Sequence, residues 1–384
     1  MHRELTPIRC AIVRGGTSKG IFLLENDLPK DQALRDKIIL QIFGSPDVRQ
    51  IDGLGGADVL TSKLAIVGAS DSPDADVDYT FGQVSMEEAF IDYGGNCGNI
   101  SSAVGGFAID QGLVKAVEPV TTVRIRMTNT NRILTAEIPV QDGHAKVEGD
   151  YTIDGVPSPG AKITLDWSDV VGGITGKLLP TGNPIDTIEA QGKTYEVSIV
   201  DAGNVVVFIR AEDLGMTGTE TPQEIDANDA LNAIIEEIRG KCCEKISLVS
   251  HWEEAKTVTP YQPFFAIVSA PTTHDCYNGA HVDEKDVDVV SRLLFMLHMH
   301  KAYPITGTVC TGACARIPGT IVYNLLSEKA KEELVLRIGH PTGTIPVETE
   351  AKVEGGEVTI SRIGVYRTAR MIMQGHVYVR TAAL

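Results

Sequence analysis

The chain has 384 residues, of which 51 are acidic and 34 basic, so its net charge is −17 at pH 7. Nucleic acids are bound by clusters of lysine and arginine, and this sequence has no basic run, so we expect no nucleic-acid partner. No stretch approaches the roughly 20 apolar residues of a membrane helix, and residues 1–5 lack the apolar run of a secretion signal. We therefore expect a cytoplasmic protein with no membrane association and with seven reduced cysteines.

The first half of the chain is dominated by short strand-like runs. Residues 8–13 and 20–24 flank a glycine-rich turn and predict a hairpin. Leu34, Ile38 and Ile42 fall on one helical face and predict a helix. The further elements predicted here are strands at residues 63–67, 79–84, 122–127 and 133–140 and a helix of small residues at 100–109.

The second half repeats this layout after a loop-rich stretch at residues 179–184, the best candidate for a linker. Its predicted elements are strands at 196–200 and 205–210, a helix at 221–241, a strand at 264–268, a helix at 284–300 and strands near the C-terminus. In each half a cysteine flanked by Gly, Thr or Asn, Cys97 or Cys310, is expected at a junction between loop and helix.

The shared layout predicts two similar α+β domains that face each other across a cleft, although the sequence shows no close internal repeat. We place the first domain at residues 1–184 and the second at residues 185–371. A C-terminal strand at about 372–384 is expected to return to the first domain.

Cys97 is the strongest candidate for chemistry. It lies in Gly-Gly-Asn-Cys-Gly-Asn, residues 94–99, a sequence that suits a tight turn with exposed amides. A helix that begins there favours a thiolate and also binds a carboxylate. A thiolate in that position can move a proton on carbon. The alternative is a small buried cysteine beside a packing turn.

Lys63 begins an apolar strand, where desolvation makes a lysine a usable base, although lysines at strand ends more often only extend toward water.

The turn at residues 14–20 offers glycines, two hydroxyls and free amides for a carboxylate, or is an ordinary hairpin turn. Its spacing is not that of a phosphate loop. The glycines at residues 52–57 do not form a dinucleotide fingerprint, so NAD and FAD are excluded.

Cys310 and Cys314, with His298 and His300 nearby, invite a zinc interpretation. Their spacing fits structural zinc sites poorly, so we expect no metal. His300 ends a predicted helix. A histidine there either stabilises the helix C-terminus or binds the substrate, and the sequence favours neither role.

Several segments, taken together and in this order, are similar to those of one known family. They are residues 14–20, 50–56, 61–63, 94–99, 201–204, 300–302, 306–307 and 315–319. From about residue 8 to its C-terminus the chain resembles the PrpF family, whose members isomerise methylaconitate, 3-methylitaconate or oxalomesaconate. The resemblance implies the diaminopimelate epimerase fold, in which two topologically similar domains each wrap a barrel-like sheet around a central helix, with the active site between them. It also implies a homo-oligomer, a dimer or tetramer.

The resemblance also implies the roles of individual residues. Lys63 and Cys97 carry over as the catalytic pair, and no metal, flavin or pyridoxal phosphate is implied. The residues expected to bind the substrate are Thr17, Ser18, Asn96, Gly98, Asn99, Asn204, His300, Thr311 and Gly312. Amino-acid epimerases of this fold use two opposed cysteines, and Cys310 stands roughly where the second would lie, so a two-thiol mechanism stays open.

We therefore predict a cofactor-independent isomerase that shifts an allylic proton in a methyl-substituted unsaturated dicarboxylate, first of all 3-methylitaconate to 2,3-dimethylmaleate, in nicotinate degradation. Removal of the allylic proton leaves a dienolate, and donors in fixed positions stabilise its negative charge. The alternatives are a 2-methylaconitate isomerase of propionate catabolism, acting on a tricarboxylate, a two-cysteine amino-acid epimerase or racemase, and a non-enzymatic anion-binding protein of the same fold.

Overall fold

The computed structural model describes residues 4–94, 96–260, 262–295 and 298–383. Gly95 of the predicted turn, residues 296–297 of the predicted helix at 284–300, and Leu384 lie outside the described residues. Contacts divide the chain into two units. Unit 1 comprises Met1–Leu165 and Tyr366–Leu384, and unit 2 comprises Asp166–Val365.

Within its described residues, unit 1 is a sheet with two α-helices. Its strands are β1 (Leu5–Gly15), β2 (Ser18–Leu24), β3 (Lys63–Ala69), β4 (Val77–Val84), β5 (Ile91–Asp92), β6 (Val120–Met127), β7 (Arg132–Gln141), β8 (His144–Ala145), β9 (Ile163–Asp166), which ends at the boundary, and β21 (Ala369–Arg380). Its helices are α1 (Gln32–Phe43) and α2 (Gly98–Asp110), with the 3-10 turns η1 (Glu25–Asp27) and η6 (Thr381–Ala383).

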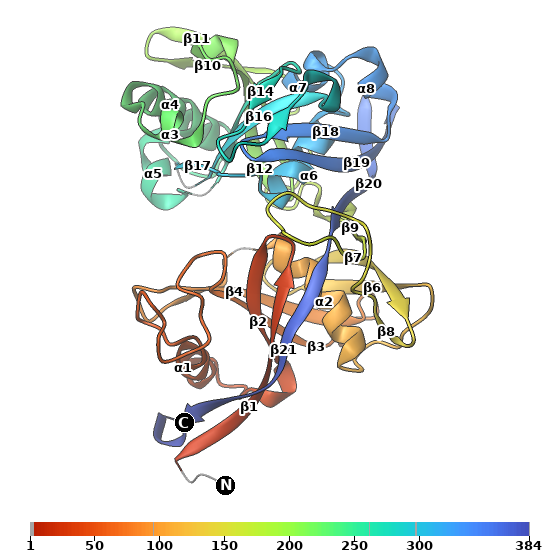
Figure 1. Cartoon of the computed structure of the whole chain (residues 1–384). Coiled ribbons are helices and arrows are strands. Elements are labelled where there is room, and N and C mark those ends of the chain that lie inside the picture. The colour runs from red at the N-terminus through yellow and green to blue at the C-terminus, as the bar shows by residue number, and fades with distance from the viewer. Residues whose placement is uncertain (1–3, 95, 261, 296–297, 384) are drawn as a thin grey trace. The chain divides into compact units, whose positions relative to one another are not determined.

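The sheet of unit 1 wraps around α2, which contacts strands β1, β2, β3, β6, β7, β8 and β21 (Figure 1). Strand β1 pairs antiparallel with β21 and with β2, β2 lies parallel to β3, β3 is antiparallel to β4, and β4 continues parallel to β6. The small residues of α2 make room for the sheet: a Cβ on Gly105 would come within 2.8 Å of Ile138. Helix α1 packs its apolar side against the alternate residues of the same strands, such as Leu64 and Ile66 of β3.

Unit 2 contains a longer set of elements. Its strands are β10 (Asp186–Ala190), β11 (Lys193–Ala202), β12 (Asn204–Arg210), β13 (Phe264–Ser269), β14 (His274–Asp275), β15 (His281–Val282), β16 (Val289–Phe295), β17 (His298–Met299), β18 (Val335–His340), β19 (Gly343–Glu354) and β20 (Glu357–Arg367), which ends in unit 1. Its helices are α3 (Pro222–Asp226), α4 (Asp229–Lys245), α5 (Ala255–Val258), α6 (Ile305–Cys314), α7 (Ile321–Leu325) and α8 (Glu328–Glu332), with η2 (Ser168–Val170), η3 (Glu212–Leu214), η4 (Trp252–Glu254) and η5 (Glu284–Asp286).

Unit 2 repeats the topology of unit 1. Strands β11 and β12 form a hairpin, β12 runs parallel to β13, β13 is antiparallel to β16, and β16 runs parallel to β18, which pairs antiparallel with β19. Helix α6 takes the place of α2 and contacts β11, β12 and β19. Two topologically similar α+β units, each with a sheet around a central helix, confirm the predicted fold.

Two predicted helices differ from the structure. The helix predicted at residues 284–300 is wrong, because η5 and strand β16 occupy most of that range. Residues 289–294 of β16 are all buried, and a strand buried on both faces has a continuous apolar run that periodicity does not separate from a helix. The helix predicted at 221–241 is two helices, because Asn228 caps α4 by accepting a hydrogen bond from the amide of Leu231.

The boundary between the two units falls after residue 165, whereas the predicted linker, residues 179–184, lies within unit 2. There the side chains of Thr181 and Asn183 donate to the carboxylate of Asp186, at 2.6 and 3.1 Å. None of the helices in the described ranges is long and apolar enough to cross a membrane.

Candidate active site

The turn between β1 and β2 packs directly on the first turn of α2, and two glycines permit this. A Cβ on Gly15 would overlap the carbonyl oxygen of Asn99, and a Cβ on Gly16 would overlap its side-chain oxygen. Gly16 also has a φ of +52°, in the left-handed region that favours glycine. The Gly-Gly pair therefore brings the hydroxyl-bearing turn against the helix N-terminus.

The side chain of Asn99 joins three separate segments. Its Nδ2 donates to Oγ1 of Thr17 at 3.0 Å, and its Oδ1 accepts from the Thr17 amide at 3.4 Å. The same oxygen accepts from Nε of Arg367, the last residue of β20, at 3.2 Å. The amide of Gly16 donates to the carbonyl of Thr368 at 2.9 Å. The turn, the start of α2 and the segment 367–368 thus form one hydrogen-bonded cluster.

Cys97 is the N-cap residue of α2, with extended backbone angles. Its carbonyl accepts from the amide and the hydroxyl of Ser101, both at 2.9 Å, whereas its thiol takes no part in capping. Cys97 is partly exposed, and the other six cysteines are buried. The first amides of a helix have no partner within it, and the helix dipole favours an anion beside them. The thiol therefore lies where a carboxylate can also bind.

Asn96 precedes Cys97, and its Nδ2 donates to the hydroxyl of Thr130 at 3.1 Å. Its Oδ1 is buried and has no hydrogen-bond partner among the described residues. The hydroxyl of Ser18, a residue that is 2% exposed, and the hydroxyl of Thr368 are in the same situation. Buried polar groups normally have partners, so these three atoms are available to a ligand.

Lys63 is the first residue of β3 and only 9% exposed. Its Nζ donates to Oε1 of Gln83 at 2.7 Å and lies 5.4 Å from the ring centroid of Phe81. The side-chain amide of Gln83 is held in place in turn, because its Nε2 donates to the carbonyl of Ser62 at 3.0 Å. No carboxylate in the described ranges pairs with Lys63. The amine therefore has neutral neighbours.

Strand β4 brings Lys63 and Cys97 to the same part of unit 1. Tyr79, Phe81 and Gln83 alternate along β4 and so lie on one face of it. Phe81 and Gln83 contact Lys63. Burial raises the pKa of the Tyr79 hydroxyl well above its usual value, and a negative charge on Cys97 adds to this effect. One face of β4 thus carries the residues that contact Lys63 and the tyrosine that lies within electrostatic range of Cys97, a contribution of β4 that the sequence analysis missed.

A similar arrangement of turn and helix occurs within unit 2. Nδ2 of Asn204, the first residue of β12, donates to the hydroxyl of Thr306 in the first turn of α6, at 2.8 Å. Its Oδ1 accepts from Nε2 of Gln262 at 3.0 Å. Gly203, with a φ of +77°, lets this turn approach α6. Asn204, predicted to bind substrate, thus occupies the position in unit 2 that the hydroxyl-bearing turn has in unit 1.

Three predicted residues of α6 lie elsewhere than expected. Helix α6 begins after Pro304, so Cys310, Thr311 and Gly312 lie in its interior and are buried. The thiol of Cys310 donates to the carbonyl of Val200 at 3.3 Å, and burial raises its pKa well above the usual value. The loop-to-helix position predicted for Cys310 is therefore wrong, and Pro304 holds the place that corresponds to Cys97.

The Thr and Gly residues of this segment, predicted to mark a junction between loop and helix, lie within α6 and serve close packing. A Cβ on Gly307 would come within 2.6 Å of Leu293, and one on Gly312 within 2.5 Å of Thr349. The hydroxyl of Thr311 donates to the carbonyl of Gly307 at 2.8 Å. Thr311 and Gly312 are thus part of the helix core, and the amides not used within the helix are those of its first turn.

His300 follows strand β17 and does not end a helix. Its amide donates to the carbonyl of Leu293 at 2.9 Å, and its Nδ1 accepts from the amide of Ala302 at 3.0 Å. His300 is partly exposed. Among the residues that the structure describes, no three His, Cys, Asp or Glu side chains lie close enough together to hold a metal ion.

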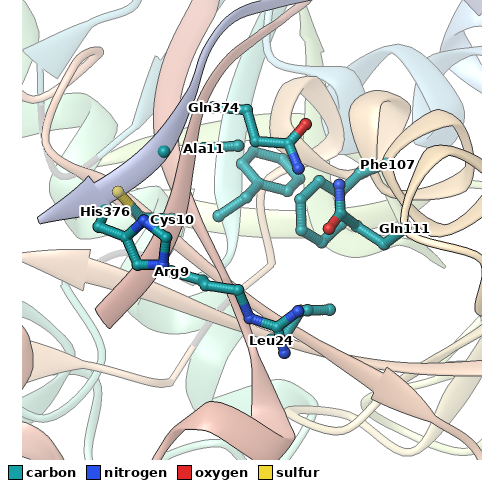
Figure 2. Close-up of a pocket in the computed structure, with 10 residues that line it drawn as sticks. Arg9, Cys10, Ala11, Leu24, Phe107, Gln111, Gln374 and His376 are labelled. Carbon is teal, nitrogen blue, oxygen red and sulfur yellow. The ribbon is translucent and has the colours of Figure 1, made fainter. Parts of the chain in front are cut away.

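A pocket of unit 1 lies away from Cys97. Figure 2 shows Arg9 from β1, His376 from β21, and Phe107 and Gln111 from the C-terminal end of α2 around it. Cys97 caps the opposite end of this helix, about 20 Å away at 1.5 Å per residue. This pocket is therefore separate from the cluster around Cys97.

Comparison with known proteins relates this cluster to a family of enzymes. The 3-methylitaconate isomerase of Eubacterium barkeri is 55% identical over 378 residues, 98% of each chain. The 2-methyl-aconitate isomerase of Shewanella oneidensis is 39% identical over 397 residues, 99% of each chain. The crystal structure of a methylitaconate-delta-isomerase matches with a TM-score of 0.92 and 54% identity, covering 99% of this chain and 97% of that one.

A hydroxyproline epimerase from Agrobacterium vitis shares only the fold, with 11% identity and a TM-score of 0.52 over 99% of this chain and 94% of that one. The two-unit topology is thus that of the diaminopimelate epimerase-like proteins. The family model described as PrpF protein matches residues 5–380. The chain belongs to the PrpF family.

Proposed function

We propose that this protein is a cofactor-independent isomerase that converts 3-methylitaconate to 2,3-dimethylmaleate. The observation that carries the proposal is the 55% identity to a 3-methylitaconate isomerase over 98% of both chains. The presence of a buried amine, Lys63, and a partly exposed thiol, Cys97, in unit 1 supports it, because the reaction requires only the transfer of a proton.

The chemistry starts at C3 of 3-methylitaconate, which bears a hydrogen, a methyl group and a carboxylate and is bonded to the carbon of the C=CH2 group. When a base removes this hydrogen, the electron pair spreads into the adjacent carboxylate and the alkene. When an acid then protonates the terminal CH2 carbon, the double bond moves between C2 and C3. One C–H bond breaks and another forms, with no net oxidation or reduction.

We assign these two proton transfers to Lys63 and Cys97. Support comes from strand β4, whose Phe81 and Gln83 contact Lys63 and whose Tyr79 lies within electrostatic range of Cys97. Gln83 is itself held by backbone carbonyls, so it fixes the position of the Lys63 amine.

Within unit 1, donors for the carboxylates of the substrate lie close to Cys97. We propose that the hydroxyls of Thr17 and Ser18, the side chains of Asn96 and Asn99 and the amide of Gly98 bind them in unit 1. In unit 2 we propose Asn204 and His300, together with the amides of the first turn of α6 in place of those of Thr311 and Gly312. Donors fixed where negative charge develops lower the barrier of such a reaction.

The test is proton NMR of the purified protein in deuterated buffer, with 3-methylitaconate, 2-methylaconitate and itaconate offered separately. We expect 3-methylitaconate to react fastest and to incorporate deuterium into the new methyl group. The Lys63→Met variant should be slowed about 100-fold or more, the usual contribution of a general acid or base. Faster turnover of 2-methylaconitate would instead assign the substrate of the relative from Shewanella oneidensis. No turnover of any of the three by a folded protein would refute the proposal.

We further propose that the enzyme acts in the cytoplasm as a homo-oligomer, a dimer or tetramer. Exposed apolar side chains in the loop between α1 and β3 support the assembly, because Val48, Ile51 and Val59 are each more than half exposed. Light scattering coupled to gel filtration measures the assembly directly.

A further inference from the structure

Arg367 carries a buried positive charge that no acidic group in the described ranges neutralises. It is 6% exposed, and its guanidinium donates to Oδ1 of Asn99 at 3.2 Å and to the carbonyl of Tyr366 at 2.7 Å. Both acceptors are neutral. Arg367 forms no ion pair with any carboxylate in the described ranges, although the chain has an excess of acidic residues. A buried charge is costly unless it is paired, so this position calls for an anion.

The surroundings of Arg367 indicate where that anion binds. Burial lowers the pKa of Arg367 to about 10, and negative charges on Tyr151 and Cys97 oppose this effect. Arg367 therefore lies within electrostatic range of the candidate catalytic thiol. The next residue, Thr368, and Ser18 of the adjoining turn have buried hydroxyls without a partner among the described residues. Arginine with neighbouring hydroxyls and helix amides suits a planar carboxylate.

We propose that Arg367 binds a carboxylate of the substrate next to Cys97, with the hydroxyl of Ser18 as a second donor. Bonding of its Nε to Asn99 fixes the plane of the guanidinium and leaves Nη2 without a hydrogen-bond partner among the residues that the structure describes. The identity of the dicarboxylate rests on the proposed function, but binding of a carboxylate at Arg367 does not. In the proposed reaction this carboxylate takes up the charge released from C3, and Arg367 neutralises that charge.

A matched control exists in unit 2. Arg292 of β16 is 1% exposed, donates to the carbonyls of Glu220 and Ser291 at 2.8 and 3.2 Å, and has its pKa lowered to about 10 mainly by burial. It resembles Arg367 in burial and in having neutral acceptors. Replacement of Arg292 therefore reports the general cost of removing a buried guanidinium.

The experiment measures calorimetric binding of 2,3-dimethylsuccinate, a saturated dicarboxylate that cannot undergo the isomerisation. We compare the wild type with Arg367→Met and Arg292→Met, and record the melting temperature of each. We expect Arg367→Met to bind about 30-fold or more weakly, as for loss of one partner from a buried charge pair, and Arg292→Met to bind as the wild type does. The KM for 3-methylitaconate should rise in parallel in Arg367→Met alone.

Unchanged binding and KM in Arg367→Met would overturn the inference, and so would equal losses in the two variants. If Arg367→Met does not fold, Arg367→Lys takes its place and should bind at least about tenfold more weakly, because an ammonium does not reproduce the fork of donors. Wild-type affinity in that variant would also overturn it. Binding that depends on Arg367 in a protein that does not isomerise 3-methylitaconate would refute only the proposed function.

Discussion

The substitution Asn99→Asp separates the stability of the cluster around Cys97 from its binding of anions. The aspartate retains the oxygen that accepts from the Thr17 amide and from Nε of Arg367. It loses only the donor to Oγ1 of Thr17, and that hydroxyl can donate to the new carboxylate instead. The substitution therefore gives Arg367 an anionic partner inside the protein.

The expected change in stability is small. Loss of the neutral hydrogen bond costs about 1 kcal/mol. A carboxylate in the first turn of α2 returns about 0.3–1 kcal/mol through the helix dipole, and the bond to Arg367 becomes charge-assisted. Asn99→Ala, by contrast, removes three hydrogen bonds, one of them from a charged group, and should cost about 3–5 kcal/mol.

The expected change in binding is large. Two like charges about 4 Å apart repel by about 4 kcal/mol at an effective dielectric constant of about 20. A carboxylate at position 99 and a substrate carboxylate on Arg367 would be separated by about this distance, since both accept from the same guanidinium. At 1.4 kcal/mol per factor of ten, affinity for a dicarboxylate should fall by roughly 1,000-fold.

Thermal melting and calorimetric titration with 2,3-dimethylsuccinate at pH 7 measure the two effects. We expect Asn99→Asp to melt near the wild type and to bind weakly, and Asn99→Ala to melt earlier and to bind weakly. Wild-type affinity in a stable Asn99→Asp protein would refute the reasoning, because an internal anion on Arg367 would then leave the binding site unaffected.

Three further predictions follow from burial and charge. Iodoacetamide on the native protein at pH 8 should modify only Cys97, detected by peptide mass spectrometry, because the other cysteines are buried and burial raises the pKa of Cys314 to about 12. Cys310→Ala should keep kcat/KM for 3-methylitaconate within about twofold, whereas loss of activity would restore the two-thiol mechanism. The side-chain hydrogen bond from Arg124 lowers the pKa of Asp76, so this pair stabilises the fold above the unfolded pKa of about 3.9 and loses its effect as pH falls through the lower folded value. Asp76→Asn should therefore cost about 1 kcal/mol in urea unfolding at pH 7 and much less near pH 3; an equal cost at both would contradict the pairing.

The sequence indicated the parts of the site that depend on local patterns. The Gly-Gly turn after β1 and the cysteine before α2 were recognisable, because tight turns and helix starts have their own residue preferences. Lys63 was recognisable as a charged residue at the start of an apolar strand. How these segments meet depends on packing that the glycines of the turn permit, and the sequence alone did not reveal it.

The rest of the site depends on long-range contacts. Arg367 is 268 residues from Asn99 and reaches it only because β21 returns to pair with β1. No short motif marks such a residue. Cys310 is misplaced in the sequence-based prediction for another reason: Thr and Gly residues surround it as they would in a loop, whereas the helix already begins after Pro304, a residue type that favours helix starts.

The two units repeat one topology, so their corresponding positions can be compared, and the side chains at those positions differ. The hairpin and parallel-strand registers match Ser18 with Asn204, and Lys63 with Phe264. The helix caps match Cys97 with Pro304.

Phe264 and Pro304 carry no exchangeable side-chain proton, so unit 2 has no acid or base at the two positions that hold the candidate catalytic pair in unit 1. The helix start of unit 2 therefore offers no thiol that corresponds to Cys97, as a two-cysteine mechanism with one thiol in each repeat would use. Placement of both candidate proton carriers in unit 1 instead suits a reaction that moves a proton between two carbons of one substrate.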